Sequence, residues 1–325
     1  MVKEFWKKPF DQWPYVKELF SFLKRIKLPG FEGLSIYTLL ELYTIGIMRG
    51  ALSSRASSIA FSLFMALFPL LIFLITLFPY LIPLIKLENQ DFDLQFLLFL
   101  ESFLPDATSE YFGDIYAQLK DQKKGGILSS SFMLSIFLVA NGVNAIFSGF
   151  EYSYHVALSR NFVKQYAYAL MVGLILSLLV IISAVTFFYV EFYFVKQATN
   201  YFTELGVNEE YQINFWDMLA KNFFFAGLTY FAISLLYFFG TVEGRKIRFF
   251  SPGALMSTIL FYFTSWGFGV YVEKFASYNE LYGALGGLLI LMLFIWLNSN
   301  VLLLGFELNA SLTSLKRSAQ KSTTI

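Results

Sequence analysis

The chain has 325 residues, of which 57% are hydrophobic and 14% charged, and its net charge is +1. Soluble globular domains carry about a quarter charged residues, so this composition excludes that class. A net charge near zero gives no overall bias toward nucleic acid, and the absence of cysteine excludes disulfides, thiolate metal sites and cysteine nucleophiles. The sequence therefore predicts an integral membrane protein.

Residues 1–50 are predicted to form a cytoplasmic or interfacial N-terminal segment. Aromatic and basic residues alternate over 1–30, which suits the headgroup zone of an anionic leaflet, although a solvated tail is the alternative. The apolar stretch 34–48 is short for a span, so we expect it to lie along the membrane. Lys mixes with Asp and Glu in residues 1–27 without a continuous apolar run, which argues against a cleavable signal peptide.

The first predicted span, 56–85, contains thirty residues without Asp, Glu, Lys, Arg or His. About 20 apolar residues suffice to cross a bilayer core. Three prolines interrupt the run: Pro69, Pro79 and Pro83. Because proline removes a backbone donor, its presence in lipid requires neighbours that satisfy the freed carbonyl groups. We therefore expect a kinked helix packed inside a bundle.

Five further apolar windows of spanning length follow the first span. They cover residues 127–150, 166–195, 215–239, 252–272 and 282–306. The sequence thus predicts an all-α integral membrane protein with a bundle of about six transmembrane helices in a domain over 51–312. An extracytoplasmic cap over 86–126 and a cytoplasmic tail over 313–325 complete the predicted organisation.

Basic residues fall unevenly on the two sides of these spans. Seventeen Lys and Arg lie on the side that carries both termini, and six lie on the other, with Lys221 left at the start of a span. The positive-inside rule then predicts that both termini are cytoplasmic and that the 86–126 loop lies outside.

A few polar residues lie within or beside the spans. Three carboxylates near span ends, Glu151, Glu273 and Glu307, are candidates for gating or coupling, because a charge at membrane depth is costly unless it is paired. The alternative is that they are boundary carboxylates within reach of water. The candidate polar lining of a pathway consists of Asn141, Asn144, Asn298, Ser299 and Asn300. Interhelical hydrogen bonds that stabilise the bundle are the alternative explanation for them.

No enzyme signature is present in the sequence. It contains one histidine, His155, and no P-loop, dinucleotide fingerprint, HExxH or GxSxG motif. The glycine-containing stretch 240–246 has the wrong spacing for a phosphate loop and is interpreted as a cytoplasmic turn between two spans. We predict no catalytic residue, no metal site and no cofactor.

Three blocks of the chain are similar to the YihY/BrkB family of bacterial inner-membrane proteins. The first is 56–71, in which a small-residue start leads through an aromatic residue to Pro69; the second runs from Gly142-Val-Asn-Ala-Ile to Tyr154-His-Val. The third combines Ser251-Pro-Gly-Ala, the loop Ser277-Tyr-Asn-Glu-Leu-Tyr-Gly and the ending Gly305-Phe-Glu-Leu-Asn-Ala. The resemblance covers about residues 35–312. It departs at Glu151-Tyr152, where many members carry an Asn-Arg pair.

The resemblance implies a multi-pass protein of the bacterial inner (cytoplasmic) membrane with an envelope role. The family's older ribonuclease label is rejected here, because metal-dependent RNA hydrolysis needs a cluster of His and Asp ligands. The leading hypothesis is a transporter or flippase-like permease for an envelope amphiphile or small solute, and the alternative is a non-transporting scaffold or envelope assembly factor. The expected partners are membrane lipids and not nucleic acid, and a homo-oligomer is left open.

Overall fold

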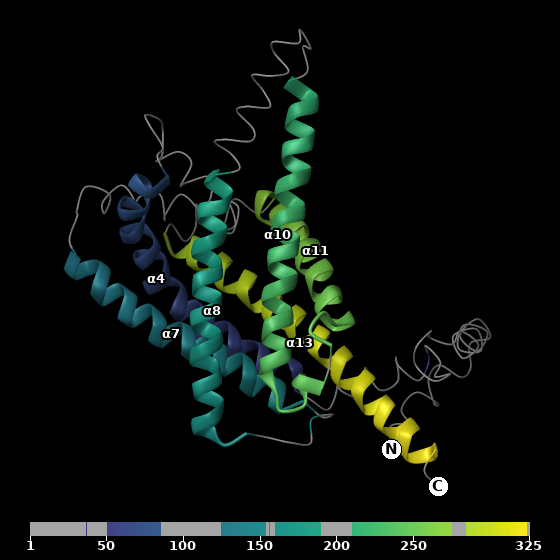
Figure 1. Ribbon diagram of the computed structural model, residues 1–325. Helices are drawn as coiled ribbons and strands as arrows, with labels where there is room; N and C mark the ends of the chain where they lie inside the picture. Colours follow the sequence, from purple (N-terminus) through teal and green to yellow (C-terminus); the bar gives the residue numbers. More distant parts are fainter. Residues whose placement is uncertain are drawn as a thin grey trace.

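The computed structural model describes residues 37, 51–85, 125–153, 156, 160–189, 210–246, 248–274 and 284–323, and within them every regular element is helical (Figure 1). Six long α-helices and one 3₁₀ turn follow in chain order: α4 (Leu52–Ile85), α7 (Gly125–Glu151), α8 (Phe162–Tyr189), α10 (Glu210–Gly240), η2 (Gly244–Lys246), α11 (Pro252–Lys274) and α13 (Ala284–Thr323). Each long helix contains a segment that is long and apolar enough to cross a membrane. The predicted all-α membrane fold is confirmed.

The predicted domain boundaries stay predictions. Apart from Tyr37, residues 1–50 lie outside the described residues, as do residues 86–124 of the expected cap. Helix α13 continues to Thr323, so it includes most of the segment predicted as a tail.

The six long helices form a closed ring in sequence order. Helix α4 packs on α7, α7 on α8, α8 on α10, α10 on α11, and α11 on α13, which returns to pack on α4. A further contact joins α7 to α10. The first and last spans are therefore neighbours, and the ring closes between them.

The main hydrophobic cluster lies toward one end of this ring. Its buried members come from the beginnings of α4, α8 and α11 and from the final parts of α7, α10 and the apolar stretch of α13: Ala56, Ile59, Val143, Ile146, Phe147, Phe150, Ala169, Val172, Ile233, Leu235, Leu236, Tyr237, Ala254, Leu303, Phe306 and Ala310. At its centre the rings of Phe150 and Phe306 stack at 4.2 Å, and Tyr237 meets Phe150 edge-on at 5.4 Å. We call this the closed end; it is the lower end in Figure 1, where η2 lies.

The apolar segments of the six helices differ in how much of each is buried. Only 17% of the apolar segment of α11 and 22% of that of α8 is buried, against 39% for α4 and α7. Glycines show the same contrast. A Cβ atom added at Gly227, Gly267 or Gly269 would meet nothing within 4 Å, whereas one at Gly305 would lie 1.9 Å from the Oγ atom of Ser257. Among the described side chains, the tightest of these helix contacts lie at the closed end.

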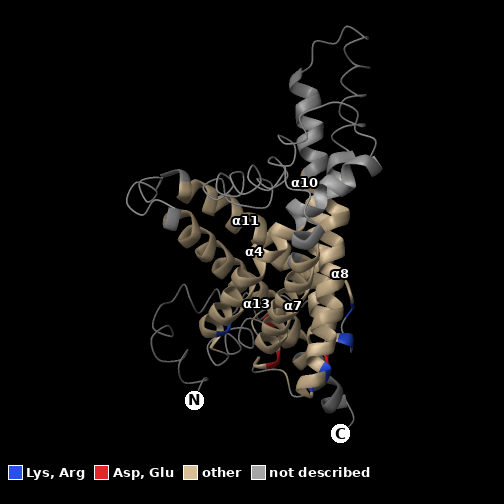
Figure 2. Ribbon diagram, turned by 90° about the vertical axis from the view of Figure 1, so that its left-hand side faces the viewer, with Lys and Arg blue, Asp and Glu red and all other residues tan. Residues whose placement is uncertain are grey.

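The charged positions coloured in the described part of the chain lie toward the closed end (Figure 2). The charged residues with described side chains there are Arg55, Arg160, Lys164, Arg245, Arg248, Glu151, Glu243 and Glu307. Three of them, Arg55, Glu243 and Glu307, are almost completely buried, and the ion pair that Arg55 and Glu307 form is the starting point for the site.

The packing contrast predicts opposite outcomes for two glycine-to-alanine substitutions. Gly305→Ala would push a methyl group into the Ser257 hydroxyl and the carbonyl oxygen of Gly253, the latter 2.5 Å away, and overpacking of this kind costs about 1–3 kcal/mol. We expect a lower melting temperature in detergent for Gly305→Ala. The matched control Gly267→Ala should melt as the parent protein does, and equal melting of both variants would contradict the packing at the closed end.

Candidate functional site

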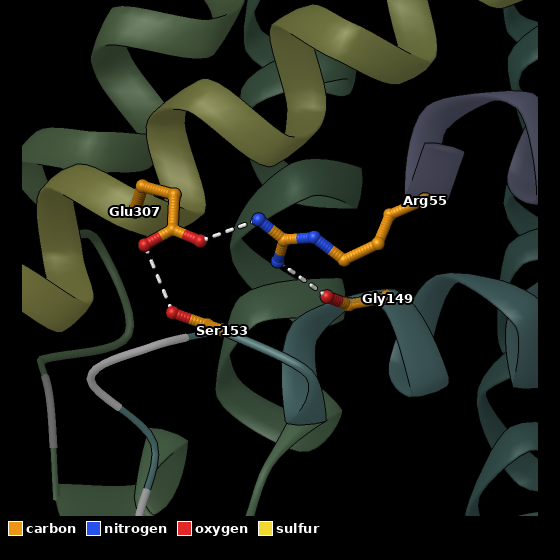
Figure 3. A network of polar contacts seen from close by, with 4 residues as sticks. All are labelled: Arg55, Gly149, Ser153 and Glu307. Carbon is orange, nitrogen blue, oxygen red and sulfur yellow. Dashed lines mark hydrogen bonds and ion pairs between the residues drawn. The ribbon is translucent and has the colours of Figure 1, made fainter. Parts of the chain in front are cut away.

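A buried ion pair joins the first span to the last (Figure 3). Arg55, in the first turn of α4, donates from Nη2 to the Oε1 atom of Glu307 on α13 at 2.8 Å. The Arg55 side chain is 7% exposed and that of Glu307 is 0% exposed. Two full charges therefore lie inside the protein at the point where the ring closes.

The end of α7 supplies the remaining partners of this pair. Nη1 of Arg55 donates to the carbonyl oxygen of Gly149 at 2.8 Å, and the Ser153 hydroxyl donates to Oε2 of Glu307 at 2.8 Å. The last carbonyl groups of a helix have no partner within that helix and carry its negative dipole end, so a cation is well placed there. Glycine at position 149 allows a close approach to α4, because a Cβ atom there would lie 2.8 Å from Cδ1 of Ile59. Three helices thus share one pair of charges.

One donor of this network stays unsatisfied. The Nε atom of Arg55 is buried and has no hydrogen-bond partner among the described residues. An unpaired buried donor costs free energy, about 1–3 kcal/mol. Both carboxylate oxygens of Glu307 therefore accept hydrogen bonds, whereas the Arg55 guanidinium uses its two Nη atoms and not Nε among the described residues.

A second polar contact fixes the start of α11 against α13. The side-chain oxygen of Asn309 accepts from the backbone N–H of Gly253 at 2.9 Å, and its amide nitrogen donates to the Ser251 hydroxyl oxygen at 2.8 Å. Ser251 also accepts from the N–H of Ala254, as an N-cap residue does, and Pro252 occupies the first helical position. Only glycine fits at position 253, where a Cβ atom would lie 2.2 Å from the carbonyl oxygen of Gly305.

A tyrosine joins three helices in the same region. The Tyr237 hydroxyl, on α10, lies 2.6 Å from the carbonyl oxygen of Leu302 and 2.7 Å from the Ser257 hydroxyl. Ser257, on α11, donates to the carbonyl oxygen of Val301 at 3.1 Å. Together with the ion pair and the Asn309 contact, these bonds connect all helices of the ring except α8 at the closed end.

The asparagines predicted to line a pathway contact different neighbours. Asn144 accepts a hydrogen bond from Gln165 of α8 at 3.2 Å, and Asn298 accepts one from Thr264 of α11 at 3.1 Å. Asn300 and Ser299 donate to carbonyl groups one turn earlier in α13, and Asn141 is exposed. These bonds are the interhelical contacts that the alternative explanation expected for Asn144 and Asn298. A lining role for the set stays a prediction.

Among the candidate gating residues, the structure places Glu307 in the ion pair. Glu151 ends α7 and its carboxylate accepts the backbone N–H of Arg160 at 3.0 Å, so it organises the loop between α7 and α8. The side chain of Glu273 lies outside the described residues.

Helix α4 is continuous through all three of its prolines. Pro69 is buried, whereas the side chains of Pro79 and Pro83 are outside the described set. The kinks stay a prediction.

Sequence reasoning missed Arg55, Ser153 and Tyr237 as members of the site. In the sequence, Arg55 contributes one positive charge to the basic side of the membrane. It also directly precedes the uncharged run 56–85. A carboxylate buried in the last span needs a cation at the same depth, and this requirement is the signal that points to Arg55. Asn309 and the Pro252-Gly253 start were both noticed in sequence, but only the structure shows that they touch.

The described residues contain no group of three or more His, Asp or Glu side chains that could hold a metal ion. Six apolar helices of spanning length, tied together by buried polar contacts, define a multi-pass α-helical membrane protein. The chain belongs to the Virulence factor BrkB family, whose sequence profile matches residues 46–324.

Similar proteins carry two kinds of name. YfkH of Bacillus subtilis, named as a ribonuclease-like protein, is 27% identical over 267 residues, which are 81% of this chain and 91% of YfkH. A UPF0761 membrane protein of Xanthomonas oryzae is 42% identical over 71 residues, covering 22% of this chain and 17% of that protein. One from Xanthomonas campestris is 38% identical over 84 residues, covering 26% and 20%. No solved structure matches the chain.

The ion pair predicts a strong energetic coupling between its two residues. Removing one partner of a buried pair leaves an uncompensated charge and costs about 3–5 kcal/mol, whereas removing both can be nearly neutral. We therefore expect Arg55→Met and Glu307→Leu each to lower the melting temperature in detergent markedly, and the double variant to recover much of the loss. The double-mutant cycle measures this coupling, and additive losses would show that the two charges do not interact.

Proposed function

We propose that the protein is a transporter or flippase-like permease whose closed end acts as a gate. The observation that carries this proposal is the buried polar network that joins five of the six long helices at one end of the ring. This network lies beside the main hydrophobic cluster, so polar and apolar contacts together hold the helices at the closed end. Transporters that alternate access must seal one side of the membrane while the other side is open, and this distribution of contacts suits such a state.

The position of the Arg55–Glu307 pair supports a gating role. It joins α4 to α13, where the ring closes, and it also holds the end of α7 through Gly149 and Ser153. Ionisable residues within membrane segments are costly and are functional candidates by default. Within the described part of the chain, the Nε atom of Arg55 has no hydrogen-bond partner, and an incompletely bonded closed arrangement costs less free energy to leave.

A second candidate function, a non-transporting scaffold, is favoured by a different observation. Asn144 and Asn298 find partners on adjacent helices, as expected for side chains that stabilise the bundle. A scaffold requires no change of packing at the closed end. The two functions therefore differ in whether material crosses the membrane.

We also propose that the ribonuclease-like label of YfkH does not describe the activity of this chain. One histidine in the sequence and the lack of a metal-ligand cluster within the described residues support this proposal.

The transport proposal predicts movement of a lipid probe in proteoliposomes. With a fluorescent phospholipid in both leaflets, external dithionite bleaches only the outer leaflet, unless the protein exchanges lipid between leaflets. We expect bleaching beyond that of protein-free vesicles, and its loss with Asn298→Leu, which replaces an amide of the predicted lining by an apolar side chain. Thr264→Val is the matched control, since it removes the hydrogen bond to Asn298 but keeps the amide. Parent protein that is folded and gives no extra bleaching would favour the scaffold.

The orientation in the bacterial inner membrane is a further proposal: both termini and the closed end face the cytoplasm. Five of the eight described charges at the closed end are basic, in agreement with the positive-inside rule. Because the chain has no cysteine, single cysteines report orientation without background. We expect Ser129→Cys to react with a membrane-impermeant maleimide in intact spheroplasts and Arg248→Cys to react only after lysis. The reverse pattern would place the closed end outside.

A further inference from the structure

Two arginine side chains lie over the same aromatic ring at the closed end. The guanidinium carbon of Arg160 is 4.5 Å from the centroid of the Tyr168 ring, and that of Arg245 is 4.6 Å from the same centroid. The two cations therefore cannot be further apart than the sum of these distances. Arg160 precedes α8, Tyr168 lies in its second turn, and Arg245 belongs to η2 after α10. We call these three residues the arginine clamp.

Local structure fixes both arginines in place. The N–H of Arg160 is held by the Glu151 carboxylate, and its Nη1 donates to the carbonyl oxygen of Phe239. Arg245 is positioned by a turn that needs glycine, because a Cβ atom on Gly244 would lie 2.3 Å from the carbonyl oxygen of Tyr237. The Thr241 hydroxyl secures this turn by accepting the Gly244 N–H at 3.0 Å. The fold thus fixes the Arg160 side chain by a hydrogen bond and the backbone position of Arg245 by the turn, and the Tyr168 ring is the contact that both guanidinium groups share.

Neither arginine has a carboxylate partner of its own within the described residues. The ion pair found there joins Arg55 to Glu307, and the nearby Glu151 carboxylate receives the backbone N–H of Arg160. Burial lowers the pKa of Arg160, the charge of Arg245 lowers it further, and Glu151 and Tyr168 act in the opposite direction. Two like charges held together over one ring would be stabilised by an anion between or beside them.

The depth of the clamp suits a lipid headgroup. The apolar segment of α8 begins at Phe162 and that of α10 ends at Gly240, so both arginines lie just outside spans. Their guanidinium groups reach back over Tyr168, which is six residues into α8 and hence about 9 Å along the helix from Phe162. The same end of α8 carries exposed apolar side chains, since Phe162 and Val163 in its first turn are each 70% exposed. In a membrane, acyl chains would cover such side chains, so the clamp lies at the level where a lipid headgroup meets its acyl chains.

We propose that the arginine clamp binds the phosphate of an anionic phospholipid headgroup. Arginine presents several N–H donors in a fixed fork that matches phosphate oxygens, and basic sites between membrane helices at a cytoplasmic surface are suited to anionic lipids. This lipid site does not depend on whether the protein transports anything, and its test measures binding alone.

The experiment measures lipid binding to the full-length protein by native mass spectrometry. Phosphatidylglycerol is titrated into protein in a neutral detergent that contains phosphatidylcholine, and bound lipids are counted. We expect the parent protein to bind phosphatidylglycerol in preference to phosphatidylcholine and Arg245→Gln to weaken this binding about tenfold, the effect of losing one charged contact. Lys164→Gln, at an exposed basic position in the first turn of α8, removes the same charge and should bind as the parent does.

Two aromatic variants separate positioning from charge. Tyr168→Phe keeps the ring and should bind phosphatidylglycerol normally, whereas Tyr168→Leu keeps both arginines but removes the ring and should bind it several-fold more weakly. Arg245 is exposed, so its substitution should leave the fold intact, which an unchanged melting temperature would show.

Three results would overturn the proposal. Equal weakening by Lys164→Gln would mean that only general surface charge attracts the lipid. Unchanged binding in Arg245→Gln would place the lipid elsewhere. Displacement of phosphatidylglycerol from the parent protein by millimolar inorganic phosphate, without displacement from Arg245→Gln, would assign the clamp to a soluble anion.

Discussion

Closing the ring of helices is the constraint on which the remainder of the structure depends. In a bilayer, apolar side chains are as well solvated by lipid as by one another, so helices associate through close packing and polar contacts. Five of the six neighbour contacts join helices that follow each other in the described chain order, whereas the sixth joins the first helix to the last. The Arg55–Glu307 pair lies at that junction, and it supplies an attraction that apolar packing alone does not.

The surrounding contacts determine how that pair is held. Small residues let the backbones approach: Gly149 admits Ile59, and Gly305 admits both Gly253 and Ser257. Polar side chains then form hydrogen bonds with backbone groups at the helix ends. Asn309 accepts from the N–H of Gly253 at the start of α11, and Arg55 donates to the carbonyl oxygen of Gly149 at the end of α7. The buried charges and the tight helix crossings therefore depend on each other, because the ion pair needs the close approach and the close approach needs residues without bulk.

Much of the fold could be predicted from sequence, because a spanning helix is a local property. Thirty uncharged residues over 56–85 specify a membrane helix wherever they occur. The partners of the ion pair are 252 positions apart, and although Arg55 directly precedes the uncharged run, nothing local identifies Glu307 as its partner. The asparagines are conspicuous in sequence, but their partners are not. Asn144 of α7 contacts α8, whereas Asn298 of α13 contacts α11. Composition and periodicity identify spans, whereas partners across the ring require the three-dimensional arrangement.

The departure from the family resemblance at Glu151-Tyr152 has a structural meaning. Tyr152 is 76% exposed, so the fold does not require a particular side chain there, and a basic residue would stand at the membrane boundary. In this chain Glu151 instead holds the N–H of Arg160, whose guanidinium lies over Tyr168 together with that of Arg245. The positive charge absent from position 152 therefore does not leave the closed end without guanidinium groups at the membrane boundary. In the proposed lipid site, Arg160 and Arg245 supply this charge, and their common contact with Tyr168 sets its depth.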